Sequence, residues 1–215
     1  IPKGVKRLRG ATLTPFYEPT VKQQHWSAAA GLWDFAHIGF NFFGVKNDEL
    51  GETTERALAA LAGASGRAEL ADAPLCVHGM SIGGGLSSRL VEALPSRVIA
   101  SAPVCLEVGP RDKPSGGVPM ITIFGERDGR QMEKLTEKLP LARAEQAQWA
   151  IAPQWGKKHD WHMANNIILP YYQRVIEHRL QPSSPTLKSY NVADGWLGDP
   201  ATWKTPSPVV APYRK

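Results

Sequence analysis

Apolar runs of strand length alternate along the chain with segments whose apolar residues recur at helical spacing. The continuous apolar runs predict strands over residues 5–14, 39–45, 74–78, 98–104, 118–124 and 148–152. The helical spacing predicts helices over residues 21–36, 53–64, 83–94, 131–139 and 163–180, with Pro140 ending the fourth and Pro170 kinking or splitting the fifth. This alternation predicts an α/β fold with a mostly parallel sheet of about six or more strands and helices on both faces.

The pattern changes after residue 180. Residues 181–215 are rich in Pro, Ser, Trp and Tyr and have no period. Because they include large apolar side chains such as Trp196, Trp203 and Tyr213, we expect most of this segment to pack on the main domain. We therefore expect an α/β domain over residues 1–180 and a packed extension over residues 181–215. The segments between strands are too short for a large lid, which implies an open and shallow site.

Composition narrows the functional class. The net charge is only +5, and the basic residues are not interleaved with aromatic ones, so we do not expect nucleic-acid binding. No apolar run approaches the roughly 20 residues that span a bilayer, so we expect no membrane span. Because the sequence opens at Ile1 and Pro2 without a methionine, we expect a removed upstream segment or a longer product, and a secreted or periplasmic location is favoured over a cytoplasmic one.

Two cysteines, Cys76 and Cys105, are too few for a disulfide framework or a zinc site. The predicted layout places them towards opposite ends of neighbouring strands. We expect both to be buried free thiols, and we expect no metal at the functional site.

The strongest local signal is the G-x-S-x-G motif at residues 79–83, which has a predicted strand before it and a predicted helix after it. Such a turn needs small residues two positions before and after the serine, and Gly79 and Gly83 meet that need. Ser81 would then project above the sheet as a nucleophile. The backbone N–H of Ile82 would face the same space and could stabilise an oxyanion. The alternative is a Gly-rich turn that binds a phosphate, but no Gly-Lys-Ser/Thr follows the motif.

A serine nucleophile requires a base, and the base requires an orienting acid. Asp128 follows the strand predicted over residues 118–124 and precedes a glycine, which favours it as the acid. Glu107, beyond the preceding strand, is its main rival, and Glu126 is a weaker candidate. His159, in the loop after the last predicted strand, is favoured as the base, and His162 is close enough in sequence to compete.

The remaining histidines fit the role of base poorly. His25 and His37 belong to or follow the first predicted helix, and His178 comes late in the last one. His78 lies in the strand before the motif, where we expect a core residue with satisfied hydrogen bonds.

With Ser81, Asp128 and His159 in this order, the chain resembles the α/β-hydrolase superfamily over about residues 5–180, and it is most similar to the esterase and dienelactone-hydrolase-like branch. The motifs that carry the resemblance lie at residues 79–83, 125–128 and 156–159. The tail at residues 195–199 also resembles such proteins. The sequence departs from the pattern in two ways. It lacks a His-Gly-Gly-Gly segment for the second oxyanion donor, and the usual two initial antiparallel strands are either missing or lie upstream of Ile1.

These residues predict hydrolysis of a carboxylic ester through an acyl-enzyme, without a metal or organic cofactor. By position, the second oxyanion donor would be the backbone N–H of Phe16 or Tyr17. Trp155 and Trp161 are expected to line the substrate pocket, which suits a small-molecule or polymer-linked ester. The alternatives are a peptidase or amidase with the same triad and an inactive hydrolase-like binding domain. The sequence leaves the oligomeric state open.

Overall fold

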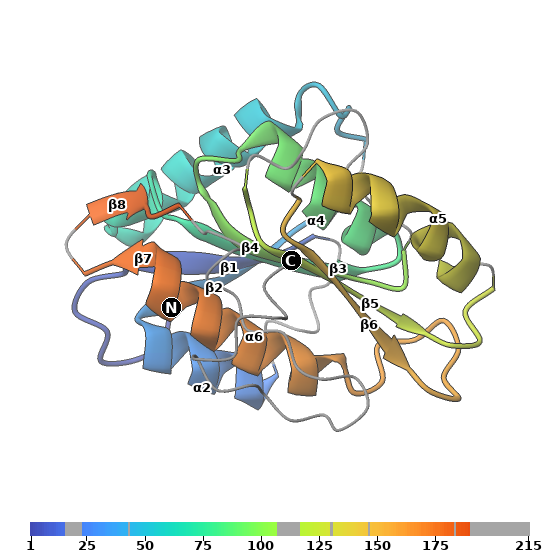
Figure 1. The fold of residues 1–215 in the computed structure, drawn as a ribbon. Coiled ribbons are helices and arrows are strands. Elements are labelled where there is room, and N and C mark those ends of the chain that lie inside the picture. Colours follow the sequence, from blue (N-terminus) through green and yellow to red (C-terminus); the bar gives the residue numbers. More distant parts are fainter. Residues whose placement is uncertain are drawn as a thin grey trace, which may run out of the picture.

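The fold is that of a computed structural model, and the structure describes residues 1–15, 23–42, 44–106, 117–129, 131–145, 147–182 and 184–189. A single sheet of six parallel strands forms its centre (Figure 1). The strands are β1 (Gly10–Pro15), β2 (Phe35–Phe40), β3 (Leu75–Met80), β4 (Val98–Val104), β5 (Met120–Gly125) and β6 (Trp149–Gln154), in the spatial order β2-β1-β3-β4-β5-β6. Because all six run in parallel, their carboxyl ends share one edge of the sheet, where ligands bind in open α/β sheets.

Helices cover both faces of the sheet (Figure 1). One face carries α2 (Gln24–Trp33) and α6 (Ala164–Arg179), and the other carries α3 (Leu50–Ser65), α4 (Ile82–Ala93) and α5 (Gln131–Ala144). A short 3-10 helix, η1 (Ala68–Leu70), follows α3. The predicted fold class is therefore confirmed. The described segments between strands contain no large inserted lid.

The sheet separates two apolar layers. Under α2 and α6 the core includes Trp26, Ile168 and Tyr172, all fully buried. Under α3 and α4 it includes Leu58 and Leu90, which are also fully buried. A smaller cluster packs α5 on β5 and β6. Both faces of the sheet therefore exclude water, as continuous apolar strands require.

The second strand was predicted in the wrong place. It was expected over residues 39–45 after a helix ending at residue 36, but β2 spans Phe35–Phe40. The helix stops earlier because Asp34 adopts a left-handed conformation at φ 56°, and its backbone N–H donates to Ala30 O and Gly31 O. Such a cap ends a helix and turns the chain at once, so the strand begins at the next residue.

The predicted end of the fourth helix at Pro140 was also wrong, because α5 continues through Pro140 to Ala144. The helix predicted over residues 163–180 is α6, which runs through Pro170 to Arg179, so Pro170 does not split it. A proline removes one helical hydrogen bond, but buried contacts on both sides of it can offset that cost. In α5, Leu135 and Ala142 lie on either side of Pro140 and are both buried against β5 and β6.

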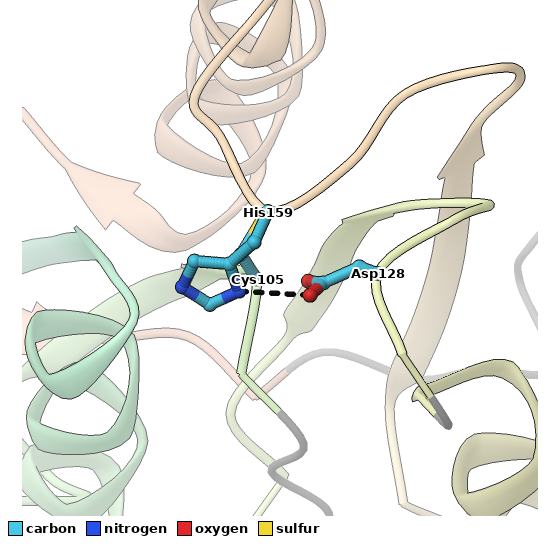
Figure 2. A group of neighbouring side chains, drawn as sticks. All are labelled: Cys105, Asp128 and His159. Atoms are coloured by element: carbon cyan, nitrogen blue, oxygen red, sulfur yellow. Dashed lines mark hydrogen bonds and ion pairs between the residues drawn. The ribbon is translucent and has the colours of Figure 1, made fainter.

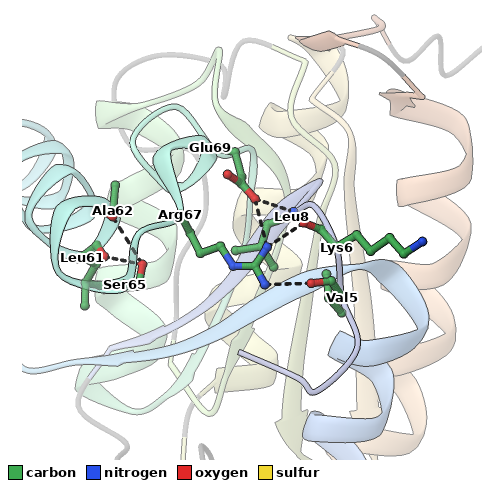
Figure 3. Close-up of polar contacts among 8 residues, drawn as sticks. All are labelled: Val5, Lys6, Leu8, Leu61, Ala62, Ser65, Arg67 and Glu69. Atoms are coloured by element: carbon green, nitrogen blue, oxygen red, sulfur yellow. Dashed lines mark hydrogen bonds and ion pairs between the residues drawn. The ribbon is translucent and has the colours of Figure 1, made fainter.

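The first strand begins at Gly10 rather than at residue 5 because side chains near η1 hold the preceding segment (Figure 3). The Arg67 guanidinium donates to Lys6 O at 2.7 Å and to Val5 O at 2.8 Å. Glu69 Oε1 accepts the backbone N–H of Leu8 at 2.9 Å, and this hydrogen bond holds the pKa of the Glu69 carboxyl below its usual value. The backbone groups of this segment are thus bonded to side chains instead of to a neighbouring strand.

After α6 the chain forms an unexpected two-stranded antiparallel sheet of β7 (Leu180–Gln181) and β8 (Ser184–Leu187). Arg179 anchors this end, because its buried guanidinium donates to Val98 O and Ile99 O at the start of β4. The rest of the predicted extension, residues 190–215, lies outside the described residues. Within the described part, no helix is both long and apolar enough to cross a membrane.

Candidate active site

Ser81 occupies the turn between β3 and α4, with φ 54° and ψ −122°. Residues other than glycine seldom adopt a positive φ, and such backbone strain is concentrated at functional sites. The Ser81 backbone N–H donates to Val104 O at 2.8 Å, and Ser81 O accepts the N–H of Gly85 at 3.0 Å. The turn is therefore fixed on both sides, to the neighbouring strand and to the first turn of the helix.

The glycines of the motif are required by close backbone approach. A Cβ atom on Gly79 would lie 2.5 Å from the carbonyl carbon and oxygen of Gly83, and one on Gly83 would lie 2.6 Å from Pro15 O. Real Cβ atoms essentially never come so close to backbone atoms. The spacing of the motif thus follows from a turn in which residues 79 and 83 touch and β1 passes directly beside them.

Asp128 and His159 meet beyond the neighbouring strand ends (Figure 2). Asp128 follows β5, His159 follows β6, and His159 Nδ1 lies 2.8 Å from Asp128 Oδ1. The Asp128 side chain is only 8% exposed, whereas that of His159 is 43% exposed. A buried carboxylate that holds one imidazole nitrogen leaves the other nitrogen able to exchange protons with a substrate or nucleophile.

Close packing of two loops brings this pair together. A Cβ atom on Gly125 would lie 2.3 Å from Lys158 O, so the end of β5 passes directly against the loop that carries His159. The Arg127 N–H donates to Lys157 O at 2.7 Å, and Glu126 Oε2 accepts the N–H of Gly156 at 2.7 Å. Glu126, weighed from the sequence as an acid, instead ties the two loops together.

The sheet topology brings Ser81 to the same edge. Ser81 directly follows β3, whose last residue, Met80, pairs with Val104 of β4. Cys105 comes next after Val104, and its Sγ lies within 4.8 Å of ligand atoms of Asp128 and His159. No hydrogen bond joins Ser81 Oγ to His159, both of which the structure describes. Such bonds are often long in the absence of substrate.

The rival candidates are placed differently. His162 has φ 42°, and its Nδ1 lies 3.6 Å from Asp160 Oδ2 rather than against Asp128. Glu107 lies outside the described residues. The described geometry therefore pairs Asp128 with His159.

The remaining predicted site residues are only partly described. Ile82 begins α4 with its side chain 69% exposed, and the first N–H groups of a helix have no partner within it. Phe16 and Tyr17 lie outside the described residues. Trp155 is 69% exposed in the loop after β6, whereas Trp161 is partly buried against the core under α6.

His78 is a core residue, but the expectation of satisfied hydrogen bonds was wrong. The side chain is fully buried, and neither ring nitrogen has a hydrogen-bond partner in the described part of the chain. Its ring stacks on Trp26 with centroids 4.0 Å apart. Burial, and then the nearby His37, lowers the pKa of His78 well below its usual value, so this histidine is neutral near pH 7.

Cys105 is the site residue that sequence reasoning assigned only to the core. It is a buried free thiol, as is Cys76, and both expectations of burial are confirmed. Cys105 has φ 54° and donates its S–H to Asp160 O at 3.1 Å. Burial, reinforced by the charge of Asp128, raises the pKa of its thiol to about 11. One feature of the sequence could have identified Cys105. It comes directly after a central strand, at the same edge of the sheet where the acid was expected.

The fold of the chain is similar to that of several solved structures. No protein-family model matches the chain, and no curated protein matches its sequence. Solved structures do match, including the esterase PE8, with a TM-score of 0.55, 14% identity and coverage of 81% of this chain and 96% of that one. The chain has the α/β-hydrolase fold.

Two further solved structures are similar to this chain. A zinc-bound, cold-adapted esterase from an Arctic intertidal metagenomic library has a TM-score of 0.57 at 14% identity, with coverage of 81% of this chain and 83% of that one. A structure from a study of carboxylesterases of the archaeon Nitrososphaera gargenis has a TM-score of 0.51 at 12% identity, with coverage of 80% and 92%. At such identities the likeness establishes the fold, while the chemistry depends on this chain's own residues.

Proposed function

We propose that this protein is a serine hydrolase that cleaves carboxylic esters, with Ser81 as nucleophile, His159 as base and Asp128 as orienting acid. The observation that carries the proposal is the 2.8 Å contact between His159 Nδ1 and a buried Asp128 carboxylate, at the sheet edge where Ser81 sits on a strained turn. The same three roles, in this order along the chain, are typical of the fold.

The proposed reaction follows from what each group can do. Ser81 Oγ attacks the ester carbonyl carbon while His159 Nε2 accepts the hydroxyl proton. Asp128 fixes the proton on Nδ1 and stabilises the imidazolium. His159 then gives its proton to the leaving alcohol, and an acyl group remains on Ser81. Water, deprotonated by the same imidazole, releases the acid.

The developing oxyanion needs hydrogen-bond donors at the turn. The backbone N–H of Ile82 lies at the start of α4, where the helix dipole favours negative charge. The second donor is assigned to the backbone of Phe16 or Tyr17. The exposed ring of Trp155 next to the His159 loop supports an open site that accepts a small or polymer-linked ester. The structural neighbours described as esterases are consistent with this substrate class.

Labelling with a fluorophosphonate probe tests the nucleophile directly. The wild-type protein should form a stable adduct, and Ser81→Ala should not. Ser65→Ala, which changes an exposed serine of α3, serves as the matched control and should label like the wild type. Equal labelling of Ser81→Ala and the wild type would exclude Ser81 as the nucleophile. Peptide mapping of the adduct would then identify the residue that reacts.

Ester hydrolysis itself is tested with p-nitrophenyl acetate, longer p-nitrophenyl esters and a feruloyl ester. Asp128→Asn should lower kcat by roughly 10⁴-fold, because an amide no longer selects the working tautomer of His159. Glu126→Gln should lower it far less, since Glu126 acts on the backbone of the loop. A larger loss on Glu126→Gln than on Asp128→Asn would contradict the assignment of the acid. Hydrolysis of amides in preference to all esters would favour a peptidase.

A further inference from the structure

Three side chains of metal-ligand type converge beyond the ends of neighbouring strands (Figure 2). Cys105 Sγ, an Asp128 carboxylate oxygen and a His159 ring nitrogen all lie within 4.8 Å of one another. They come from three different strand ends, β4, β5 and β6, so the sheet itself fixes their mutual position. The proposed triad uses only two of them, and the thiol has no part in it.

A second observation points to a ligand at this place. Asp128 Oδ1 is bonded to His159, but Asp128 Oδ2 is buried and has no hydrogen-bond partner in the described part of the chain. A buried carboxylate oxygen without a partner is costly, and such atoms commonly face an ion, a water or another donor. The Cys105 thiol donates to Asp160 O and also interacts with the Asp128 carboxylate. Because His159 is 43% exposed, the group is open to solvent on the histidine side.

We infer that Cys105, Asp128 and His159 bind a thiophilic divalent ion such as Zn²⁺ or Cd²⁺, and that this ion inhibits the esterase. The inhibition rests on the proposed function, whereas the binding does not. Thiolate and imidazole ligands favour Zn²⁺ and its heavier analogue over Mg²⁺ and Ca²⁺, which prefer oxygen. Ligand atoms around a tetrahedral ion lie about 3.5 Å apart, so shifts of about 1 Å or less complete the site.

Binding exchanges protons for metal bonds. The Cys105 S–H proton passes to solvent as the sulfur–metal bond forms, and the hydrogen bond to Asp160 O is released. An Asp128 oxygen and His159 Nδ1 supply the next two bonds, and water from the open side supplies the fourth. The metal thereby replaces the proton that His159 Nδ1 shared with Asp128.

Inhibition follows from the tautomer of His159. A neutral imidazole carries one proton, and a metal on Nδ1 forces that proton onto Nε2. The Nε2 lone pair that would accept the Ser81 proton is then occupied. The ion therefore blocks the base without touching the serine, and a chelator should restore activity.

Direct binding is measured with Cd²⁺ by the ultraviolet absorption of its thiolate complex, in the Ser81→Ala background so that catalysis plays no part. Cys76 is the matched control, because it is the only other cysteine and is buried at the far end of β3. Cys76→Ser should keep the full absorption, and Cys105→Ser should lose it. Absence of the absorption in Cys76→Ser, where Cys105 is the sole thiol, overturns the proposal even if Cys105→Ser does not fold.

Inhibition is measured by titrating Zn²⁺ into the active protein during p-nitrophenyl acetate hydrolysis. The Zn²⁺ concentration for half inhibition should rise at least about tenfold in Cys105→Ser, with each variant compared with its own metal-free rate. Mg²⁺ should not inhibit, and Cys76→Ser should respond like the wild type. Equal inhibition of Cys105→Ser and the wild type would place the inhibitory ion elsewhere and refute the proposal.

The binding measurement and the inhibition measurement together distinguish a failure of this inference from a failure of the proposed function. Cadmium–thiolate absorption at Cys105 in a protein without esterase activity would support the binding site and reject the esterase. An active esterase whose Cys105 never binds Cd²⁺ would support the function and reject the metal site.

Discussion

The backbone of Ser81 has φ 54° and ψ −122°, a conformation that few residues other than glycine adopt, because a Cβ atom makes it unfavourable. Replacing it with glycine should relieve that strain. We expect the free energy of unfolding of Ser81→Gly to exceed that of Ser81→Ala by about 1 kcal/mol, because the alanine variant keeps the strained Cβ. Denaturant unfolding of the two variants, both lacking the nucleophile, measures the difference.

This pair of variants isolates backbone strain from the loss of the hydroxyl. If Ser81→Gly is less stable than Ser81→Ala, the turn is not strained and the entropy cost of glycine dominates. If it is more stable, the protein gives up stability to hold its serine on a strained turn, as functional sites commonly do.

At the scale of residues, the sequence singled out Asp128 and His159, and the structure brings the two side chains within hydrogen-bonding distance, while their catalytic roles stay a proposal. Both lie beyond strands in the order that the fold requires, so local pattern was sufficient. The role of Glu126 could not be read in the same way, because its partner, the Gly156 N–H, lies 30 residues further along the chain. Cys105 was missed for a similar reason, since its proximity to Asp128 depends on the packing of three strand ends.

Among the elements, α2 is joined to the sheet by a stack of aromatic rings. Trp26 of α2 lies parallel to His78 of β3 and to His37 of β2, with centroids 4.0 Å and 5.4 Å away. Burial keeps the pKa of His78 well below its usual value of 6.5. The unfolded chain therefore binds a proton at His78 that the folded protein excludes, and the stability contributed by the neutral ring is present above about pH 6.5 and is lost as the pH falls below it.

We expect the free energy of unfolding to fall as the pH is lowered from about 7 to about 5, with His78 contributing up to about 1.4 kcal/mol per pH unit. His78→Phe preserves a ring for Trp26 and cannot titrate, so its stability should depend less on pH over this range. Urea unfolding at several pH values measures both slopes. Parallel slopes for His78→Phe and the wild type would contradict the assignment.

The order and type of the main elements followed from the alternation of apolar patterns, but several boundaries did not. The end of α2 depends on the left-handed conformation of Asp34, and an aspartate gives a weaker signal for it than a glycine. Helix α5 passes Pro140 because Leu135 and Ala142 are buried on either side of it. The start of β1 is set by Arg67, a residue more than 50 positions away. The last two of these boundaries were decided by tertiary contacts that no local window contains.

For the whole molecule, parallel strand order explains why distant residues form one site. Every strand presents its carboxyl end at the same edge, so Ser81, Cys105, Asp128 and His159 all lie beyond strand ends at that edge although they are spread over nearly 80 positions of the sequence. Recognising the alternation of strands and helices was therefore enough to predict the edge, while the distances between side chains required the structure.

The sheet also determines how the molecule should unfold. Its two apolar layers share the same six strands, so neither layer has a complete core alone. We expect one cooperative transition, which Leu58→Ala in α3 and Ile168→Ala in α6 should each destabilise by about 2–5 kcal/mol, since both side chains are fully buried. Their effects should add in the double variant, because the residues lie on opposite faces. Calorimetry measures the unfolding transition and the stability of each variant, and circular dichroism and tryptophan fluorescence should report the same midpoint. Separate transitions for the two layers would show that the chain divides into independent units.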